Sequence, residues 1–152
     1  MADPRRGASG RLGRARSDPI RHHDLCFGCG QANLFGLQLE LEPAPGGGVE
    51  GRFFVKQDHQ GPPGVAHGGV LAAALDEAMA LLLHGEGILA LTGRLEIDLL
   101  APAAVGAFVQ VSARLEAIEE PKLRLAAQAS GEGGERLASA RGTFVRVSGL
   151  ER

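Results

Sequence analysis

The apolar stretch of residues 67–84 constrains the fold of this chain more than any other feature. Residues 70–83 are apolar except for Asp76 and Glu77, and a helix that is apolar on every side is expected to be buried. The stretch is too short to span a bilayer, so protein has to bury it. Removing a carboxylate from water is costly unless a partner or a raised pKa relieves it. We therefore expect at least one of the two acids to have a function.

The composition indicates one globular domain and excludes several partners. The chain has 152 residues, 44% of them hydrophobic, and a formal net charge of −2. Such a charge creates no global field that would attract nucleic acid or an anionic membrane. Trp and Tyr are absent and only 6 Phe are present, which leaves few rings for stacking on bases. We expect neither nucleic acid nor membrane as a partner.

The N-terminal region predicts a tail followed by the domain. Arginine is frequent among small residues at the start of the chain, which favours a flexible, Arg-rich tail over residues 1–20 and a single domain over residues 21–152. An organelle transit peptide is the alternative for the tail. The two cysteines are too few for a disulfide framework and follow no apolar signal segment, so we expect a cytoplasmic location.

Cys26 and Cys29 form a Cys-x-x-Cys pair that resembles half of a metal site, with His22 and His23 as further candidate ligands. A structural zinc site normally needs four ligands at known spacings, and two adjacent histidines just before a Cys-x-x-Cys match none that is familiar. We therefore expect no metal, no other cofactor and no redox dithiol. The cysteines are expected to pack the N-terminal segment near the functional site.

The remaining segments predict antiparallel strands around the helix. Residues 37–42 alternate apolar and polar positions, and after a Pro/Gly-rich break residues 49–56 return as the second strand of a hairpin. Strand patterns follow the helix at residues 88–91, 94–100, 105–118, 123–130 and 136–147. This order predicts an α+β fold in which a curved antiparallel sheet of five to six strands wraps one long apolar helix. Because one sheet covers only part of such a helix, a two-fold dimer is expected.

Several motifs resemble the hotdog-fold acyl-CoA thioesterases. They are the His67-Gly-Gly sequence, Asp76 nine positions after it, and the stretch 92–102. The similarity is greatest to the branch of phenylacetyl-CoA and 4-hydroxybenzoyl-CoA thioesterases and covers residues 25–147. The Cys26-Phe-Gly-Cys-Gly opening is also similar to one subgroup of these proteins. The resemblance implies the hotdog fold, thioester hydrolysis of an acyl-CoA without a cofactor, and active sites at the interface of a homodimer, with pairing of dimers into tetramers left open.

The resemblance implies catalytic roles for four residues. Asp76 would act as a general base on water or attack the thioester to give a mixed anhydride. The backbone amides of Gly68 and Gly69 at the positive end of the helix would stabilise the oxyanion. Gly68 and Asp76 are eight residues apart, or about 12 Å along a helix, so they cannot flank one carbonyl group. The acid of one subunit must therefore meet the helix start of another, while Thr92 would support the acid or the water.

Four residues are implied in substrate binding. Gln60 matches a position in the loop before the helix that contacts the thioester or orients water, and a different loop register would place His59 or Asp58 there instead. His67 would orient the start of the helix. Arg94 is one of several basic residues that could meet the phosphates of CoA. None of these assignments follows from spacing alone.

Alternatives remain open at the level of the sequence. Asp76 could be a structural acid bonded to backbone or to Arg94. Glu77 faces about 100° away from it and is expected to reach solvent or the subunit interface, and His84 is expected to cap the end of the helix. For the whole chain, the alternatives are a hotdog protein that binds acyl-CoA without hydrolysis, and a hotdog hydratase or dehydratase.

Overall fold

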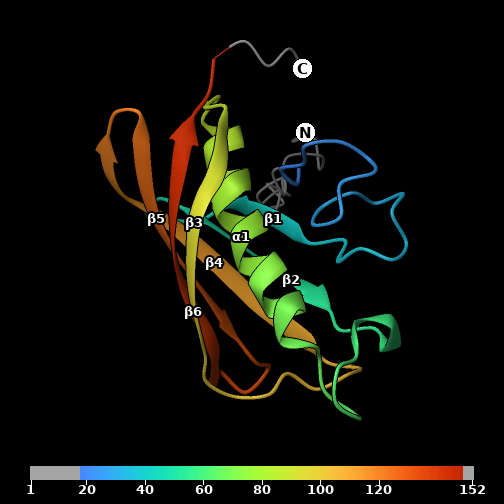
Figure 1. Ribbon diagram of the computed structural model, residues 1–152. Helices are drawn as coiled ribbons and strands as arrows, with labels where there is room; N and C mark the ends of the chain where they lie inside the picture. Colours follow the sequence, from blue (N-terminus) through green and yellow to red (C-terminus); the bar gives the residue numbers. More distant parts are fainter. Residues whose placement is uncertain (1–17, 149–152) are drawn as a thin grey trace, which may run out of the picture.

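A computed structural model describes residues 18–148. Figure 1 shows one long helix lying across a curved sheet. The elements in chain order are β1 (Glu40–Pro43), β2 (Val49–Phe54), the short 3₁₀ helix η1 (Gln57–His59), α1 (Gly68–Gly85), β3 (Ala90–Leu99), β4 (Phe108–Glu119), β5 (Lys122–Ser130) and β6 (Arg136–Arg146). Most of the predicted tail lies outside the described residues. Within its last part, Ile20 pairs with Leu41 and so belongs to the fold.

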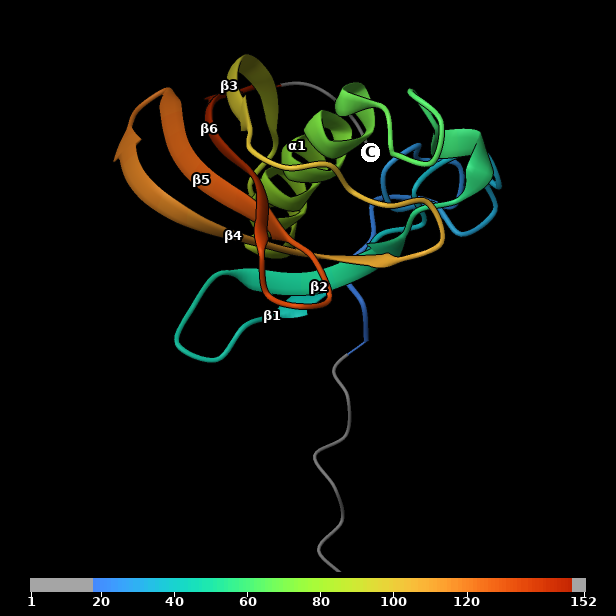
Figure 2. The ribbon, with the colours of Figure 1, turned by 90° about the horizontal axis from the view of Figure 1, so that it is seen from below.

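The six strands form one antiparallel sheet in the order β1-β2-β4-β5-β6-β3. Figure 2, in which the molecule is seen from below, shows that the sheet curls around α1. Alternate residues of the strands, such as Val49 and Phe53 in β2, are buried toward the helix. This is the predicted hotdog architecture. It leaves β1 and β3 as the two edges of the sheet.

The helix has one uncovered side. Its large apolar residues pack against the sheet, and they include Leu71, Leu75, Met79, Leu81, Leu82 and Leu83. The side chains of Ala73, Asp76 and Ala80 are only partly buried, and their spacing places them on one stripe of the helix. A single copy of the chain therefore leaves a stripe of small residues around Asp76 open, as expected for one sheet.

The helix, Gly68–Gly85, begins and ends one residue later than the stretch 67–84 that the sequence indicates. With 18 residues it reaches the lower limit for crossing a membrane, so the expectation that it is too short is wrong by this measure. Half of the helix is nevertheless buried against the rest of the chain. It is the core helix of this domain.

The N-terminal segment, residues 20–39, covers a second side of the helix with little regular structure. Figures 1 and 2 both show α1 between this segment and β3. Cys29, Leu37 and Leu39 are buried. Gln38 has a positive φ of 50°, which is incompatible with an extended strand. The first strand therefore begins at Glu40 and not at the predicted residue 37.

The third strand also differs from its prediction. The patterns at residues 88–91 and 94–100 belong to one strand, β3, whose register shifts between Thr92 and Arg94. Gly93 lies at this irregularity, and a bulge of this kind bends a strand without ending it. A break in the alternating pattern therefore marks a bulge in this place and not a turn.

Candidate active site

Asp76 and Thr92 form the centre of the candidate site. The Thr92 hydroxyl donates a hydrogen bond to Asp76 Oδ1 over 2.6 Å. Asp76 comes from the uncovered side of α1, and Thr92 lies near the start of the edge strand β3. Arg94, the alternative partner of Asp76, pairs instead with Glu96 at 2.7 Å. The two residues predicted to work together are therefore adjacent across the open edge of the fold.

The surroundings of Asp76 favour its protonated form. Burial raises the pKa of this carboxyl, the Thr92 hydrogen bond lowers it, and the charge of Glu77 raises it further, with a net shift upward. A carboxylate whose pKa lies above its usual value is a better proton acceptor. The hydroxyl of Thr92 fixes its orientation, and no other hydrogen bond to Asp76 occurs within the described part of the chain.

The helix start is organised by His67. This residue is the N-cap of α1, and its ring nitrogen Nδ1 accepts a hydrogen bond of 2.9 Å from the Gly69 amide. The expectation that both glycine amides are free is therefore wrong for Gly69. The Gly68 amide precedes the helical ladder and donates to no group of the described chain. This cap hydrogen bond is compatible with the predicted role of His67 in orienting this end of the helix.

The start of the helix lies at the far end of β3 from Thr92. A Cβ atom added to Gly68 would lie 2.8 Å from Leu99 Cδ1, so Gly68 sits against the last residue of this strand. Asp76 contacts Thr92 near the strand's first residue. Within one chain, the acid and the helix start therefore lie at opposite ends of β3.

Two of the predicted binding residues stabilise the loop before the helix. His59 is buried, its Nδ1 accepts from the Lys56 amide at 3.1 Å, and its Nε2 lies 3.1 Å from the Gly36 carbonyl. Because both ring nitrogens have protein partners, His59 has no donor left for a substrate, which corrects its assignment as a binding residue. Gln60 is exposed, and its side-chain oxygen accepts from the Gly64 amide at 2.8 Å.

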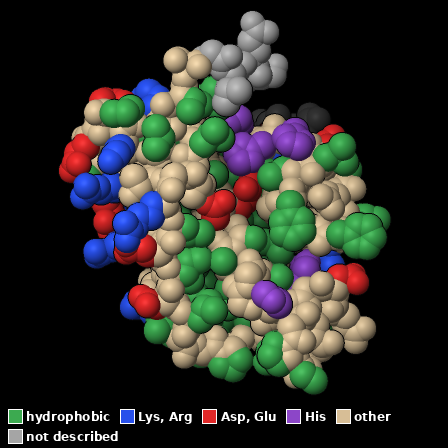
Figure 3. All heavy atoms as spheres, viewed as in Figure 1, with side chains coloured by type: hydrophobic (Ala, Val, Ile, Leu, Met, Phe, Trp, Pro, Cys, Tyr) green, Lys and Arg blue, Asp and Glu red, His purple; other side chains and the backbone are tan. Residues whose placement is uncertain are grey.

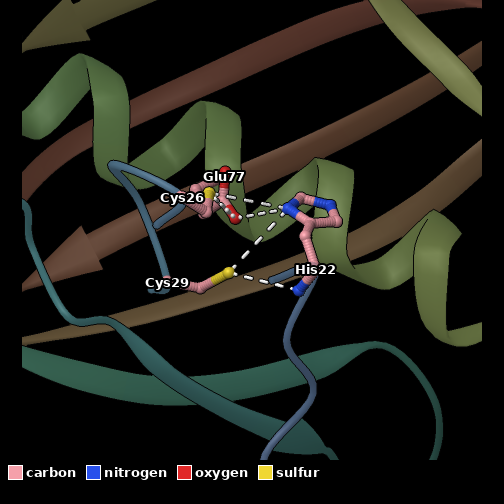
Figure 4. Close-up of side chains that lie close together, drawn as sticks. All are labelled: His22, Cys26, Cys29 and Glu77. Carbon is pink, nitrogen blue, oxygen red and sulfur yellow. Dashed lines mark hydrogen bonds and ion pairs between the residues drawn. The ribbon is translucent and has the colours of Figure 1, made fainter. Parts of the chain in front are cut away.

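Glu77 contradicts its prediction. It is 8% exposed and faces the N-terminal segment, not solvent or the subunit interface. His22 Nδ1 lies 3.0 Å from Glu77 Oε1, and the Cys26 thiol donates to the same oxygen at 3.4 Å. Figure 4 shows Glu77 pointing from α1 toward His22, Cys26 and Cys29. A helical wheel gives the direction of Glu77 but not the segment that covers it.

The groups around Glu77 perturb one another strongly. Hydrogen bonds to Cys29 and Glu77 raise the pKa of His22 to about 11. Burial alone would raise the pKa of Glu77, but the hydrogen bond and charge of His22 lower it below its usual value. Burial raises the pKa of the Cys29 thiol. The cluster therefore retains positive charge beside a buried carboxylate.

Acidic and histidine side chains gather over α1, between β3 and the N-terminal segment, on the face drawn in Figure 3. A hollow of about 700 Å³ lies elsewhere, on the solvent-facing side of β1, β2 and β4. It is lined by residues such as Glu42, Arg52 and Gln110 and includes no predicted site residue. The candidate site is consequently an open surface of the single chain.

Comparisons with known proteins match this fold and these motifs. A family model described as the thioesterase superfamily matches residues 63–136. The human acyl-coenzyme A thioesterase THEM5 is 34% identical over 91 residues, which are 58% of this chain and 36% of the human protein. The match therefore spans only about a third of that protein's length.

Solved structures extend the likeness to most of the chain. The thioesterase superfamily protein RHA08564 has a TM-score of 0.75 and 25% identity, over 80% of this chain and 60% of its own. A hypothetical thioesterase from Streptococcus pneumoniae TIGR4, determined with coenzyme A, has a TM-score of 0.68 and 18% identity, over 74% of this chain and 88% of its own. Two variants of that protein replace an aspartate or a threonine 16 positions later by alanine. The family-model match over residues 63–136 and the hotdog fold show that this part of the chain is of the thioesterase-superfamily type.

Proposed function

We propose that this protein is an acyl-CoA thioesterase in which Asp76 acts on the thioester. The observation that carries the proposal is the 2.6 Å hydrogen bond from Thr92 to Asp76 on the uncovered side of the helix. The name of the human relative and the coenzyme A in the pneumococcal structure support the substrate class. The variants of the pneumococcal protein support the pair, since their aspartate and threonine have the same spacing of 16 as Asp76 and Thr92.

The chemistry requires one free carboxylate oxygen and one anion site. Thr92 holds Oδ1 of Asp76, which leaves Oδ2 as the oxygen that would act on the substrate. As a base, Asp76 takes a proton from water while the water oxygen bonds to the carbonyl carbon. As a nucleophile, it forms that bond itself and leaves an acyl anhydride for water to open. In both routes the carbonyl oxygen becomes an oxyanion, and the carbon–sulfur bond breaks to release the CoA thiolate, which is then protonated.

The anion site is supplied by a second copy of the chain. On one chain, Gly68 lies by Leu99 at the end of β3, whereas Asp76 lies by Thr92 near its start. If two β3 strands pair in antiparallel fashion about a two-fold axis, the start of each strand lies beside the end of the other. The Gly68 amide of one copy then lies beside Asp76 of the other. Each dimer has two such sites.

Three features of the single chain support this pairing. β3 is an edge of the sheet, so its outer backbone groups are free to bond a further strand. Its apolar residues Leu91 and Leu99 are more than half exposed, at 55% and 56%. The open stripe of α1 consists of small residues around Asp76, which allow a second helix to approach closely. A two-fold dimer covers all three features.

A thiol-release screen tests the function. The protein is incubated with short, medium, long and aryl acyl-CoAs, and free CoA is measured. We expect hydrolysis of at least one class, and a loss of about 100- to 10,000-fold in kcat for Asp76→Asn, the range for removal of a general base. The matched control is Glu42→Gln, an exposed carboxylate on β1 at the other edge of the sheet, which should retain wild-type turnover.

Three outcomes would overturn the proposal. An Asp76→Asn variant that retains full activity would show that the Asp76 carboxylate takes no part in the reaction. Tight acyl-CoA binding without turnover on any chain length would indicate a binding protein instead. Addition of water to an enoyl-CoA, with no release of CoA, would indicate a hydratase.

A further inference from the structure

Four side chains that commonly bind metals meet beside the helix. They are His22, Cys26 and Cys29 from the N-terminal segment and Glu77 from α1, and their ligand atoms all lie within 4.8 Å of one another. Figure 4 shows the four side chains pointing toward one common point. The proposed hydrolysis uses none of them.

The distances between these atoms match tetrahedral coordination. A zinc ion bound at about 2.3 Å from sulfur and about 2.0 Å from nitrogen or oxygen separates sulfur from a nitrogen or oxygen ligand by about 3.5 Å. His22 Nδ1 lies 3.7 Å from Cys26 Sγ and 3.8 Å from Cys29 Sγ. Glu77 Oε1 lies 3.4 Å from Cys26 Sγ and 3.0 Å from His22 Nδ1. These four separations lie within about half an ångström of the tetrahedral values, and all the ligand atoms lie within 4.8 Å of one another.

We propose that His22, Cys26, Cys29 and Glu77 bind a structural zinc ion that fastens the N-terminal segment to α1. Two sulfurs separated by two residues are a common half of a zinc site, and imidazole and carboxylate are also established zinc ligands. Four protein ligands close the coordination sphere, which characterises structural sites and not catalytic ones. The expectation of no metal rested on a spacing of histidines and cysteines that matches no familiar zinc site, and Glu77, 51 positions after Cys26, is a candidate ligand that such local spacing does not reveal.

The backbone around the cysteines is shaped for this arrangement. The His22 amide donates a hydrogen bond to Cys29 Sγ at 3.4 Å, which stabilises negative charge on the sulfur. The Gly30 amide donates to the Cys26 carbonyl at 2.8 Å and closes the turn between the two cysteines. A Cβ atom at Gly28 would lie 2.3 Å from Glu77 Cγ. Glycine therefore leaves the space through which Glu77 reaches the cysteines.

A disulfide between the cysteines is the main competing arrangement. Both cysteines are free thiols in the structure, and each sulfur has His22 Nδ1 within 3.8 Å. Bonding the sulfurs to each other would leave the buried Glu77 carboxylate with His22 alone as an ionic partner. Zinc instead uses all four groups, and its two positive charges offset most of the negative charge of two thiolates and the carboxylate.

The zinc would position Asp76 without contacting substrate. Glu77 is the neighbour of Asp76 on the helix, so a ligand bond to Glu77 fixes the rotation of α1 about its axis at the candidate site. The segment that the metal fastens, residues 20–39, has little secondary structure of its own. In such segments the free energy of metal binding becomes free energy of folding.

The test measures metal in the full-length protein, independent of hydrolysis. We expect about one zinc per chain by elemental analysis after reconstitution and gel filtration. Cobalt(II) in its place should give the strong ligand-field bands of a tetrahedral ion and sulfur-to-cobalt charge transfer. Cys29→Ser and Glu77→Gln should weaken zinc binding by more than about 100-fold, beyond the range for replacing residues that only hydrogen-bond to a metal ligand. The matched control His23→Ala, an exposed neighbour of His22, should bind zinc like the wild type.

Each contrary result is decisive. A reduced wild-type protein that retains no zinc or cobalt after gel filtration would overturn the proposal, and this measurement needs no variant to fold. A cobalt spectrum without charge transfer would show that the cysteines are not ligands. Equal zinc affinities of the Glu77→Gln variant and the wild type would show that Glu77 is not a zinc ligand. A zinc-loaded protein that lacks thioesterase activity would overturn only the proposed function.

Discussion

Two inactive variants should restore activity to each other if the site is shared between subunits. In one copy, Asp76→Asn removes the carboxylate. In the other, Gly68→Asp places a negative charge at the helix start, where the oxyanion would form. Aspartate is favoured in the first turn of a helix, and the nearest atom to a Cβ at position 68 is the end of the Leu99 side chain. The second variant should therefore fold.

The geometry fixes the expected magnitude. Each homodimer has two defective sites, with losses of about 100-fold or more from the absent base or the blocked oxyanion site. In a heterodimer, both substitutions fall in the same site, and the other site combines an intact Asp76 with an intact Gly68. Purified heterodimer should therefore have about half of the wild-type kcat per dimer, since a two-fold interface creates two equivalent sites.

The assay uses co-expression of the two variants with different affinity tags, purification on both tags, and acyl-CoA hydrolysis. A heterodimer of two Asp76→Asn copies is the negative control, and a heterodimer of Asp76→Asn with wild type should have the same half activity. If the mixed heterodimer is as inactive as its parents, the acid and the helix start act within one chain and the β3 pairing is wrong. Failure to recover any doubly tagged species would refute the dimer itself.

Other substitutions separate positioning from packing. Thr92→Val should lower kcat by about 10- to 100-fold with little change in KM, since it removes a hydrogen bond to a charged group. Thr92→Ser keeps the hydroxyl and should restore the rate. Equal kcat values for the Val and Ser variants would show that the hydroxyl has no role in the reaction. His59→Ala should lower the free energy of unfolding by about 2–4 kcal/mol in urea titrations and leave kcat unchanged. If the His59→Ala variant is stable but binds substrate less tightly, His59 takes part in substrate binding after all.

The architecture of this chain follows closely from its sequence pattern. The apolar run of the helix and the period of two in the strands predict an α+β fold with one wrapped helix, because burial has to be satisfied in this way. The strand boundaries are less predictable. Gln38 adopts a positive φ and Gly93 lies at a bulge, and neither conformation is encoded in hydrophobic alternation.

The site is predictable only where its residues belong to a regular element. The Asp76–Thr92 pair joins a helix to the strand that follows it, and both residues lie within motifs shared with hotdog thioesterases. Glu77 and His59 are bonded instead to the irregular segment of residues 20–39. The path of such a segment depends on many tertiary contacts and has no period in the sequence. Spacing along a helix or loop therefore predicts the wrong surroundings for charged or polar residues that this segment covers.

The open edge of β3 has a consequence for how the protein is maintained in solution. A ten-residue strand with free backbone groups and exposed leucines is a template for any other extended chain. In the proposed dimer an identical copy would occupy that template, so that assembly and solubility would depend on the same surface. A substitution that weakens the dimer should first be seen as precipitation at moderate concentration, before any change in the chemistry of the remaining dimers.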